Sequence, residues 1–265
     1  MLMPKRFLLS LAAATLLSVG VKAQNNYGCF TPMHKSTTLF GIQLTPGVPL
    51  LSHQNNYGNP KLNSKPAFKC GIGVNLGFLV SSKDVIQIEA NYQPMGNKYT
   101  GTGYKGALER EVNLVYWSLP ILYKHYFFND ELVESVSADK PGKLKWYIEG
   151  GPYIAALASA EVKNTINGQP ATIQEATMTE SGPNPTVQDV GDSKQLYLRN
   201  DWGFQLGWGL DIAVMEGLYI NLGLRGITGM KDINPEKFRA KDAQGNYKPS
   251  KNDMIAARIG LQMRF

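Results

Sequence analysis

The stretch Ile255-Ala256-Ala257-Arg258-Ile259-Gly260-Leu261-Gln262-Met263-Arg264-Phe265 decides the fold of this chain. Every second residue from Ile255 to Phe265 is apolar, and the alternate positions hold arginine, glutamine, alanine or glycine. A period of two is that of a β-strand with one apolar and one polar face. About 9–11 residues are enough for a tilted strand to cross a bilayer. The pattern predicts a transmembrane strand whose apolar side chains face lipid and whose polar side chains face a barrel lumen.

Seven further segments have strand-like patterns, although the fourth alternates poorly and is interrupted by Pro120. The eight predicted strands are Thr37–Thr45, Phe68–Val80, Val85–Tyr92, Val112–Phe127, Lys145–Ala160, Asp201–Ala213, Leu218–Ile227 and Asp253–Phe265. We therefore expect an all-β fold, an eight-stranded antiparallel transmembrane β-barrel.

Short and long connections alternate between these strands. Ser81–Asp84 and Val214–Gly217 are short, and Asn129–Lys143 is the one connection that breaks the alternation. The long connections are Pro46–Lys65, Asn97–Glu111, Glu161–Asn200 and Lys231–Asn252. Outer-membrane barrels have short periplasmic turns and longer outside loops, so both N- and C-termini are predicted to be periplasmic. Asn167-Gly168 and Gly245-Asn246 are hairpin-turn signals, which predict that some strands project beyond the membrane as hairpins.

The first residues have the features of a targeting segment. Lys5 and Arg6 precede an apolar run from Phe7 to Val19, and small residues follow before Gln24. This predicts a signal peptide over 1–23, a periplasmic N-terminal tail over 24–36 and a barrel domain over 37–265. An N-terminal membrane anchor is the alternative, but the apolar run is short for a helix that needs about 20 residues.

Charge gives little information about partners. Removing the three basic residues of the predicted signal leaves 24 basic and 21 acidic residues, a net charge of +3. No basic patch with interleaved aromatic residues is present, so we expect no nucleic-acid partner.

Period two alone does not decide which face meets lipid, since a soluble lipocalin-type barrel turns its apolar face inward. Three features favour the membrane. Glycine is frequent on the polar parity, which suits a crowded lumen. Aromatic residues lie near predicted strand ends, where they would form interfacial girdles: Tyr92, Tyr126, Trp146, Trp202 and Phe265. The final strand ending in Phe265 resembles the C-terminal signal recognised by barrel assembly machinery. We therefore expect a cell outer membrane location, with outer-membrane lipid and that machinery as partners.

Charged residues on the polar parity are predicted to face the lumen: Glu89, Glu149, Asp211, Arg225, Arg258 and Arg264. Opposite charges in a confined space should pair, because an isolated buried charge is costly. Eight strands leave an interior that side chains can fill. We expect a structural network and a plugged barrel rather than a solute pore.

The two cysteines, Cys29 and Cys70, are expected to be free thiols, unless the N-terminal tail threads into the barrel. Cys29 precedes the first strand on the periplasmic side, and Cys70 begins the second strand near the outer side. The hydrocarbon core that separates the two sides is about 30 Å thick. Disulfide-bonded Cα atoms lie within about 7 Å.

No pattern of catalytic or ligand-binding residues stands out. Small outer-membrane barrels that are enzymes place a nucleophile or an acid–base group at the outer rim, with histidine as the usual base. Only His34, His53 and His125 occur, and neither these nor the cysteines have metal-ligand spacing. We expect no enzyme activity, no cofactor and no metal. An outer-leaflet lipid enzyme using His53 and a solute channel are the less favoured alternatives.

The chain resembles the PorT-like outer-membrane β-barrel family, many of whose members are described as porin-family proteins of Gram-negative bacteria. The segments that carry the resemblance are Trp117–Lys124, Gly150–Tyr153, Asp201–Phe204 with Gly207–Gly209, and Ile259–Phe265. The resemblance implies a non-enzymatic barrel with a structural or accessory role in envelope assembly or protein secretion, in contact with other envelope or secretion proteins. A surface-exposed binding or adhesion barrel, acting through its long outer loops, is the alternative.

Overall fold

The computed structural model describes residues 38–52, 62–81, 83–127, 141–178, 192–239 and 247–265. The predicted signal peptide and periplasmic tail lie outside these residues, as do Cys29, His34, His53 and the Gly245-Asn246 turn. The strands are β1 (Thr38–Ser52), β2 (Asn63–Lys65), β3 (Lys69–Leu79), β4 (Asp84–Gly103), β5 (Gly106–Tyr126), β6 (Leu144–Ile166), β7 (Gln169–Ala171), β8 (Asn200–Met215), β9 (Leu218–Gly229) and β10 (Lys251–Arg264). Helical turns occur at α2 (Ile173–Ala176) and in the short 3-10 helices η4 (Ser193–Leu196) and η5 (Glu236–Phe238). No helix in the described ranges has the length and apolarity to cross a membrane.

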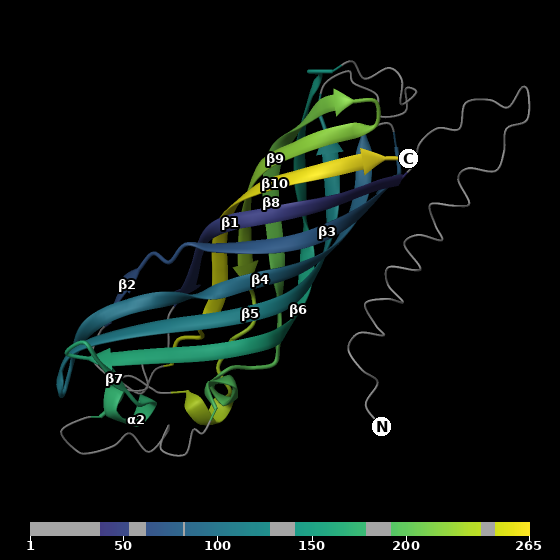
Figure 1. Cartoon of the computed structure of the whole chain (residues 1–265). Helices are drawn as coiled ribbons and strands as arrows, with labels where there is room; N and C mark the ends of the chain where they lie inside the picture. The colour runs from purple at the N-terminus through teal and green to yellow at the C-terminus, as the bar shows by residue number, and fades with distance from the viewer. Residues whose placement is uncertain (1–37, 53–61, 82, 128–140, 179–191, 240–246) are drawn as a thin grey trace, which may run out of the picture. The chain divides into compact units, whose positions relative to one another are not determined.

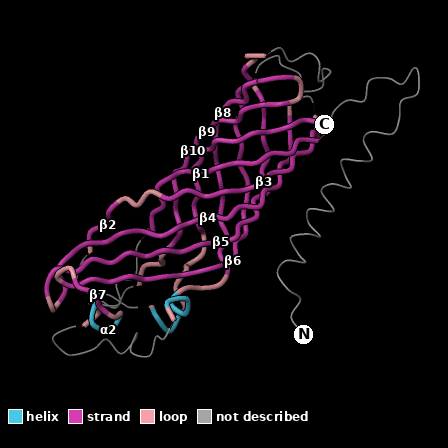
Figure 2. The backbone as a smooth tube through the Cα atoms, in the orientation of Figure 1, coloured by secondary structure: helices cyan, strands magenta, loops and turns pink. Residues whose placement is uncertain are grey.

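Eight of the strands close into a ring through antiparallel pairing. The ring runs β1-β3-β4-β5-β6-β8-β9-β10 and returns to β1 (Figures 1 and 2). The closing pair extends from Leu39 opposite Arg264 to Ser52 opposite Lys251. Each ring strand corresponds to one of the eight predicted strands, so the predicted eight-stranded antiparallel barrel is confirmed.

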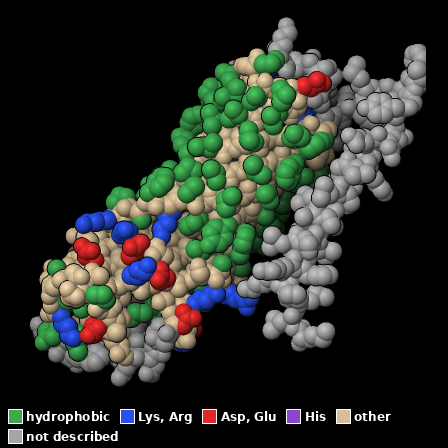
Figure 3. All heavy atoms as spheres, in the orientation of Figure 1, with side chains coloured by type: hydrophobic (Ala, Val, Ile, Leu, Met, Phe, Trp, Pro, Cys, Tyr) green, Lys and Arg blue, Asp and Glu red, His purple; other side chains and the backbone are tan. Residues whose placement is uncertain are grey.

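Alternation along β10 shows which face is outside. Ile259 and Leu261 are about half exposed, whereas Arg258 and Gln262 are each 2% exposed. The same alternation puts exposed apolar side chains on all eight ring strands. Figure 3 shows those of one face as a green belt. A closed barrel leaves no backbone edge unpaired in lipid, and its apolar exterior suits the hydrocarbon core. The chain is therefore an outer-membrane β-barrel protein, as predicted.

Four of the five residues predicted for the aromatic girdles face outward, although Tyr92 lies near the middle of β4 rather than at a strand end. Tyr92, Trp146, Trp202 and Phe265 are exposed on the outside, between 37% and 58%. Tyr126 was placed wrongly, because its side chain is 2% exposed and points into the barrel. The irregular alternation around Pro120 hid the parity of this strand.

Strands β4, β5 and β6 continue well beyond the apolar belt, and their pattern inverts as they leave it. On β5, Leu119 and Ile121 face outward within the belt. Further out, Val112 and Leu114 face inward and are fully buried, while Glu109 faces solvent. One strand thus crosses from lipid, where apolar residues point out, to water, where they point in. We call the outer parts of these three strands, residues 95–103, 106–116 and 157–166, the extension.

Two of the connections predicted to be long are shorter in the structure, because the strands beside them continue. Asn97–Glu111 was predicted to be a long loop, but it is a continuous hairpin closed by Tyr104 and Lys105. The Pro46–Lys65 connection is likewise shortened, because β1 continues to Ser52. The predicted turn at Asn167-Gly168 is confirmed: both residues have positive φ, 51° and 81°, and they join β6 to β7. Positive φ at both central residues is the signature of the hairpin turn that suits twisted strands.

Short segments cover the free edges of the extension. Strand β2 pairs with β4, and β7 pairs with β6. The η4 segment also lies along β6, where the N–H of Val162 donates to Ser193 Oγ at 3.3 Å. Covered edges prevent pairing with other chains, which an exposed sheet edge invites.

Candidate functional site: the barrel interior and its outer cap

Four charged side chains meet in the middle of the barrel and form what we call the charge layer: Glu89 on β4, Glu149 on β6, Arg225 on β9 and Arg258 on β10. Arg225 donates to both oxygens of Glu89, from Nη1 at 2.7 Å and from Nη2 at 2.8 Å. It also donates to Glu149 Oε1, from Nε at 3.0 Å and from Nη2 at 2.6 Å. Arg258 Nη1 donates to Glu149 Oε2 at 2.7 Å. All four side chains are 3% exposed or less.

Amides complete the hydrogen bonding of Glu89. Its carboxylate accepts from Gln43 Nε2 at 3.0 Å, Gln87 Nε2 at 2.7 Å and Asn91 Nδ2 at 2.9 Å. Gly73 leaves room for this cluster, since a Cβ there would overlap the side-chain oxygen of Asn91. A buried ion pair is tolerated only when its remaining hydrogen-bonding capacity is met.

A second ion pair lies next to the charge layer, toward the short-turn end. Lys124 Nζ contacts Asp211 Oδ2 at 3.0 Å and lies 3.8 Å from the ring centre of Tyr147. The Tyr126 hydroxyl donates to the same oxygen of Asp211 at 2.5 Å. Asp211 is among the residues predicted for the lumen and Lys124 is not, because the sequence of β5 alternates too poorly to show which of its residues face inward.

Arg264, also predicted for the lumen, is 5% exposed at the end of β10. It lies six residues beyond Arg258 on the same face, a distance of about 20 Å along a strand. The structure thus brings together four of the six predicted residues, places Asp211 beside them and puts Arg264 at the barrel end.

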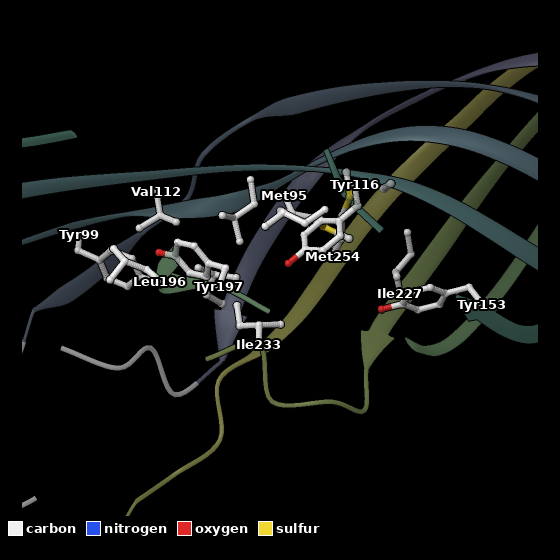
Figure 4. Packing of buried hydrophobic residues seen from close by; sticks show 14 of the residues in the cluster. Met95, Tyr99, Val112, Tyr116, Tyr153, Leu196, Tyr197, Ile227, Ile233 and Met254 are labelled. Atoms are coloured by element: carbon white, nitrogen blue, oxygen red, sulfur yellow. The ribbon is translucent and has the colours of Figure 1, made fainter. Parts of the chain in front are cut away.

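A hydrophobic core fills the barrel beyond the charge layer (Figure 4). It combines inward side chains of the strands with side chains from the connections after β7 and β9. Its buried members, which we call the outer core, are Leu51, Met95, Tyr99, Val112, Leu114, Tyr116, Tyr153, Leu157, Leu196, Tyr197, Ile227, Ile233, Phe238, Met254 and Ala256. Leu196 and Ile233 are fully buried. Where the outer core meets the polar lumen, a cavity lined partly by Gln93 and Gln205 has a volume of about 10 Å³, room for one water.

Asp232 organises the connection that carries Ile233 into the outer core. Its Oδ1 accepts from the backbone N–H groups of Asn234 at 3.1 Å and Ser250 at 3.2 Å. Its Oδ2 accepts from the Tyr247 hydroxyl at 2.9 Å and from Arg239 Nε at 2.9 Å. Burial and the contact with this carboxylate raise the pKa of Tyr247, so its hydroxyl stays protonated as the donor. Asp232 ties both ends of the connection together.

We predict that Asp232→Ala will loosen this connection without unfolding the barrel. Leaving several partly buried donors without an acceptor costs about 1–3 kcal/mol, so the local open state should become about tenfold more populated or more. Limited proteolysis of the detergent-solubilised protein should cut the 231–252 segment correspondingly faster. Glu236→Ala, at an exposed position of the same connection, should leave the cleavage rate unchanged. Equal rates for Asp232→Ala and the parent would contradict this role.

The remaining predicted residues lie apart from the charge layer. His125 Nδ1 is 2.7 Å from Asp84 Oδ1, near the Ser81–Asp84 turn. Cys70 is an exposed free thiol. Cys29, the other cysteine predicted to be free, lies outside the described residues. Within the described ranges, no group of three or more His, Cys, Asp or Glu residues is arranged to hold a metal ion. Phe265 is anchored by its N–H, which donates to Thr38 O at 2.9 Å, and its side chain is 58% exposed.

No family model and no curated protein matches the sequence. Among solved structures, the chain is similar to OprG of Pseudomonas aeruginosa, with 13% identity, a TM-score of 0.42, and 88% of this chain and 97% of that one covered. It is similar to Neisserial surface protein A, with 10% identity, a TM-score of 0.40, and 86% and 97% covered. It is also similar to Ail, the attachment invasion locus protein of Yersinia pestis, with 9% identity, a TM-score of 0.39, and 87% and 99% covered. At these scores the likeness carries nothing about ligands or activity.

Proposed function

We propose that this chain is a non-enzymatic, sealed outer-membrane barrel, PorT-like, with a structural or accessory role in envelope assembly or protein secretion. The observation that carries the proposal is the filled interior. A layer of mutually paired charges and a hydrophobic core lie one beyond the other along the barrel. A barrel built this way has no path for solutes, so its work falls to the surfaces that it presents outside the membrane.

The extension supplies such a surface. It is a stiff sheet rather than a set of loops, because β4 and β5 stay paired to Gly103 opposite Gly106. Its outer side carries charged residues, including the Lys98–Glu111 pair at 3.5 Å. Blue and red side chains gather toward this end in Figure 3, away from the green belt. A rigid polar platform fixed to the membrane suits docking to another envelope or secretion component.

The test is the secreted proteome of a strain that lacks the gene, compared with its parent and with a strain complemented by the intact gene. If the proposal is right, secreted proteins accumulate in the periplasm of the deletion strain while the outer membrane stays intact, and complementation restores secretion. Normal secretion in the deletion strain would remove the secretion role.

A second candidate is a surface binding barrel that acts through its outer connections. The hairpin tip favours it, because Tyr104 is 59% exposed there and exposed aromatic residues are common anchors in binding surfaces. Protease treatment of intact cells should then release peptides from the connection between β7 and β8, residues 172–199, which lies within the predicted Glu161–Asn200 connection. Failure to release any peptide from an intact surface would argue against this role.

A further inference from the structure

A hollow lined by two basic side chains lies where β8 leaves β6. The two strands pair from Leu144 opposite Ile212 to Ala156 opposite Asn200. Beyond this point β6 continues into the extension without β8, still paired with β5 on its other edge, and the η4 segment runs beside it. The hollow has a volume of about 280 Å³ and is lined by Leu157, Lys194, Tyr197 and Arg199.

Both basic residues are held in place by β6. Lys194 Nζ donates to the carbonyl oxygen of Ala158 at 2.8 Å, which leaves its other protons for a ligand. The carbonyl oxygen of Arg199 accepts from the N–H of Leu157 at 2.6 Å. Leu157 and Tyr197, the other two lining residues, are buried, at 6% and 4% exposed, and form the floor of the hollow.

The hollow carries an excess of positive charge. None of its four lining residues is acidic, and among the described residues neither Lys194 nor Arg199 takes part in an ion pair. Two carboxylates lie two residues away in sequence, and both accept hydrogen bonds from other groups. Asp192 accepts from the backbone N–H of Lys194 at 2.9 Å, and Asp201 accepts from the N–H of Trp202 at 2.8 Å and from Asn252 Nδ2 at 2.9 Å. Arginine and lysine side chains without a protein partner are suited to an oxyanion, and arginine binds phosphate with two parallel hydrogen bonds.

The position of the hollow fits the headgroup region of the membrane. Trp202 pairs with Ile154 on the outer face, and both side chains are exposed, at 48% and 63%. Tryptophan is enriched at the boundary between lipid and water. Arg199 precedes Trp202 by three residues, a distance of about 10 Å along the strand direction. Acyl chains packed against Trp202 and Ile154 would therefore bring a headgroup to Arg199 and Lys194.

We propose that this hollow binds the phosphate of an outer-leaflet lipid, with Arg199 and Lys194 as the phosphate ligands. Such a lipid would hold the η4 segment against β6 and fix the orientation of the extension on the membrane. The site is independent of the proposed role in assembly or secretion.

Native mass spectrometry of the purified protein in detergent can test the site, with phosphatidic acid as the probe and zwitterionic phosphatidylcholine as the reference lipid. Replacing both residues by alanine should weaken phosphatidic acid binding by about tenfold or more, since each charge-assisted hydrogen bond contributes more than a neutral one. The matched control is Lys98→Ala with Lys163→Ala, two exposed lysines that each pair with a carboxylate, at 3.5 Å and 3.2 Å. This control should bind like the parent.

A second variant and a competition with inorganic phosphate complete the test. If the double alanine variant does not fold, Lys194→Gln with Arg199→Gln removes the charges and keeps polar side chains of similar reach. Equal binding of phosphatidic acid by the parent and by a folded charge-free variant would overturn the proposal. Displacement of the lipid by inorganic phosphate at an equal concentration would also overturn it, because the hollow would then recognise free phosphate rather than a lipid.

Discussion

Replacing Arg225 with alanine will destabilise the barrel by about 3–5 kcal/mol, the expected cost of removing one partner from a buried charge cluster. Arg225 is 2% exposed and donates four hydrogen bonds, two to Glu89 and two to Glu149. Without it, two buried carboxylates share the single arginine that remains in the charge layer, Arg258. One negative charge would stay uncompensated in a region without solvent. Unfolding by urea in detergent, followed by the gel mobility of the folded barrel, measures the loss.

Two variants isolate the cause of this loss. Lys163→Ala removes a charge from an exposed pair with Glu161, at 3.2 Å, and should change stability by about 0–1 kcal/mol. Adding Glu89→Gln to Arg225→Ala removes the uncompensated charge and keeps a side chain that can hydrogen-bond. This double variant should recover a large part of the lost stability. If Arg225→Ala is as stable as the parent, the charge layer does not hold the barrel together.

The second large effect concerns two outward positions on the same strand. Leu119→Arg places a charge in the apolar belt, where an arginine near the middle of the bilayer costs about 2–4 kcal/mol. Glu109→Arg places the same side chain ten residues away on the same face, in the extension. Water surrounds that position, so the change should stay within about 0.5 kcal/mol. Refolding into lipid vesicles should show the loss only for Leu119→Arg.

This pair tests the inverted pattern of β5 rather than arginine tolerance in general. If both substitutions are equally harmful, lipid covers the extension and the boundary between belt and extension is misplaced. If neither is harmful, Leu119 does not face the hydrocarbon core.

Strands that stay within the membrane could be predicted from the sequence. Along β10, one environment lies on each side of the strand, so Ile259 and Arg258 follow a strict period of two. The predicted ends of β4 and β5 were too short because those strands pass from lipid into water. There, apolar residues such as Val112 and Leu114 change sides relative to the belt, and the period-two pattern loses its meaning across the boundary.

The charge layer was accessible from sequence for a physical reason. A lone charge on a lumen-facing position of a narrow barrel needs a partner, so Glu89, Glu149, Arg225 and Arg258 could be grouped from parity alone. Lys124 was not predicted to face the lumen, because the alternation of β5 in the sequence is too poor to assign its inward face. The outer-core residues Leu196, Ile233 and Phe238 could not be predicted, because they lie in connections between strands, where burial follows no regular period.

If side chains seal the barrel from end to end, as we propose, the barrel carries no ion current across a planar lipid bilayer. The purified parent protein should be inserted into the bilayer, and gel mobility should verify that it is folded in the same lipid. An absence of current then cannot be due to failed insertion. We expect no stepwise current above that of bilayers treated with detergent alone. Reproducible unitary openings from the folded parent protein would contradict it and would restore a solute channel as the function of this barrel.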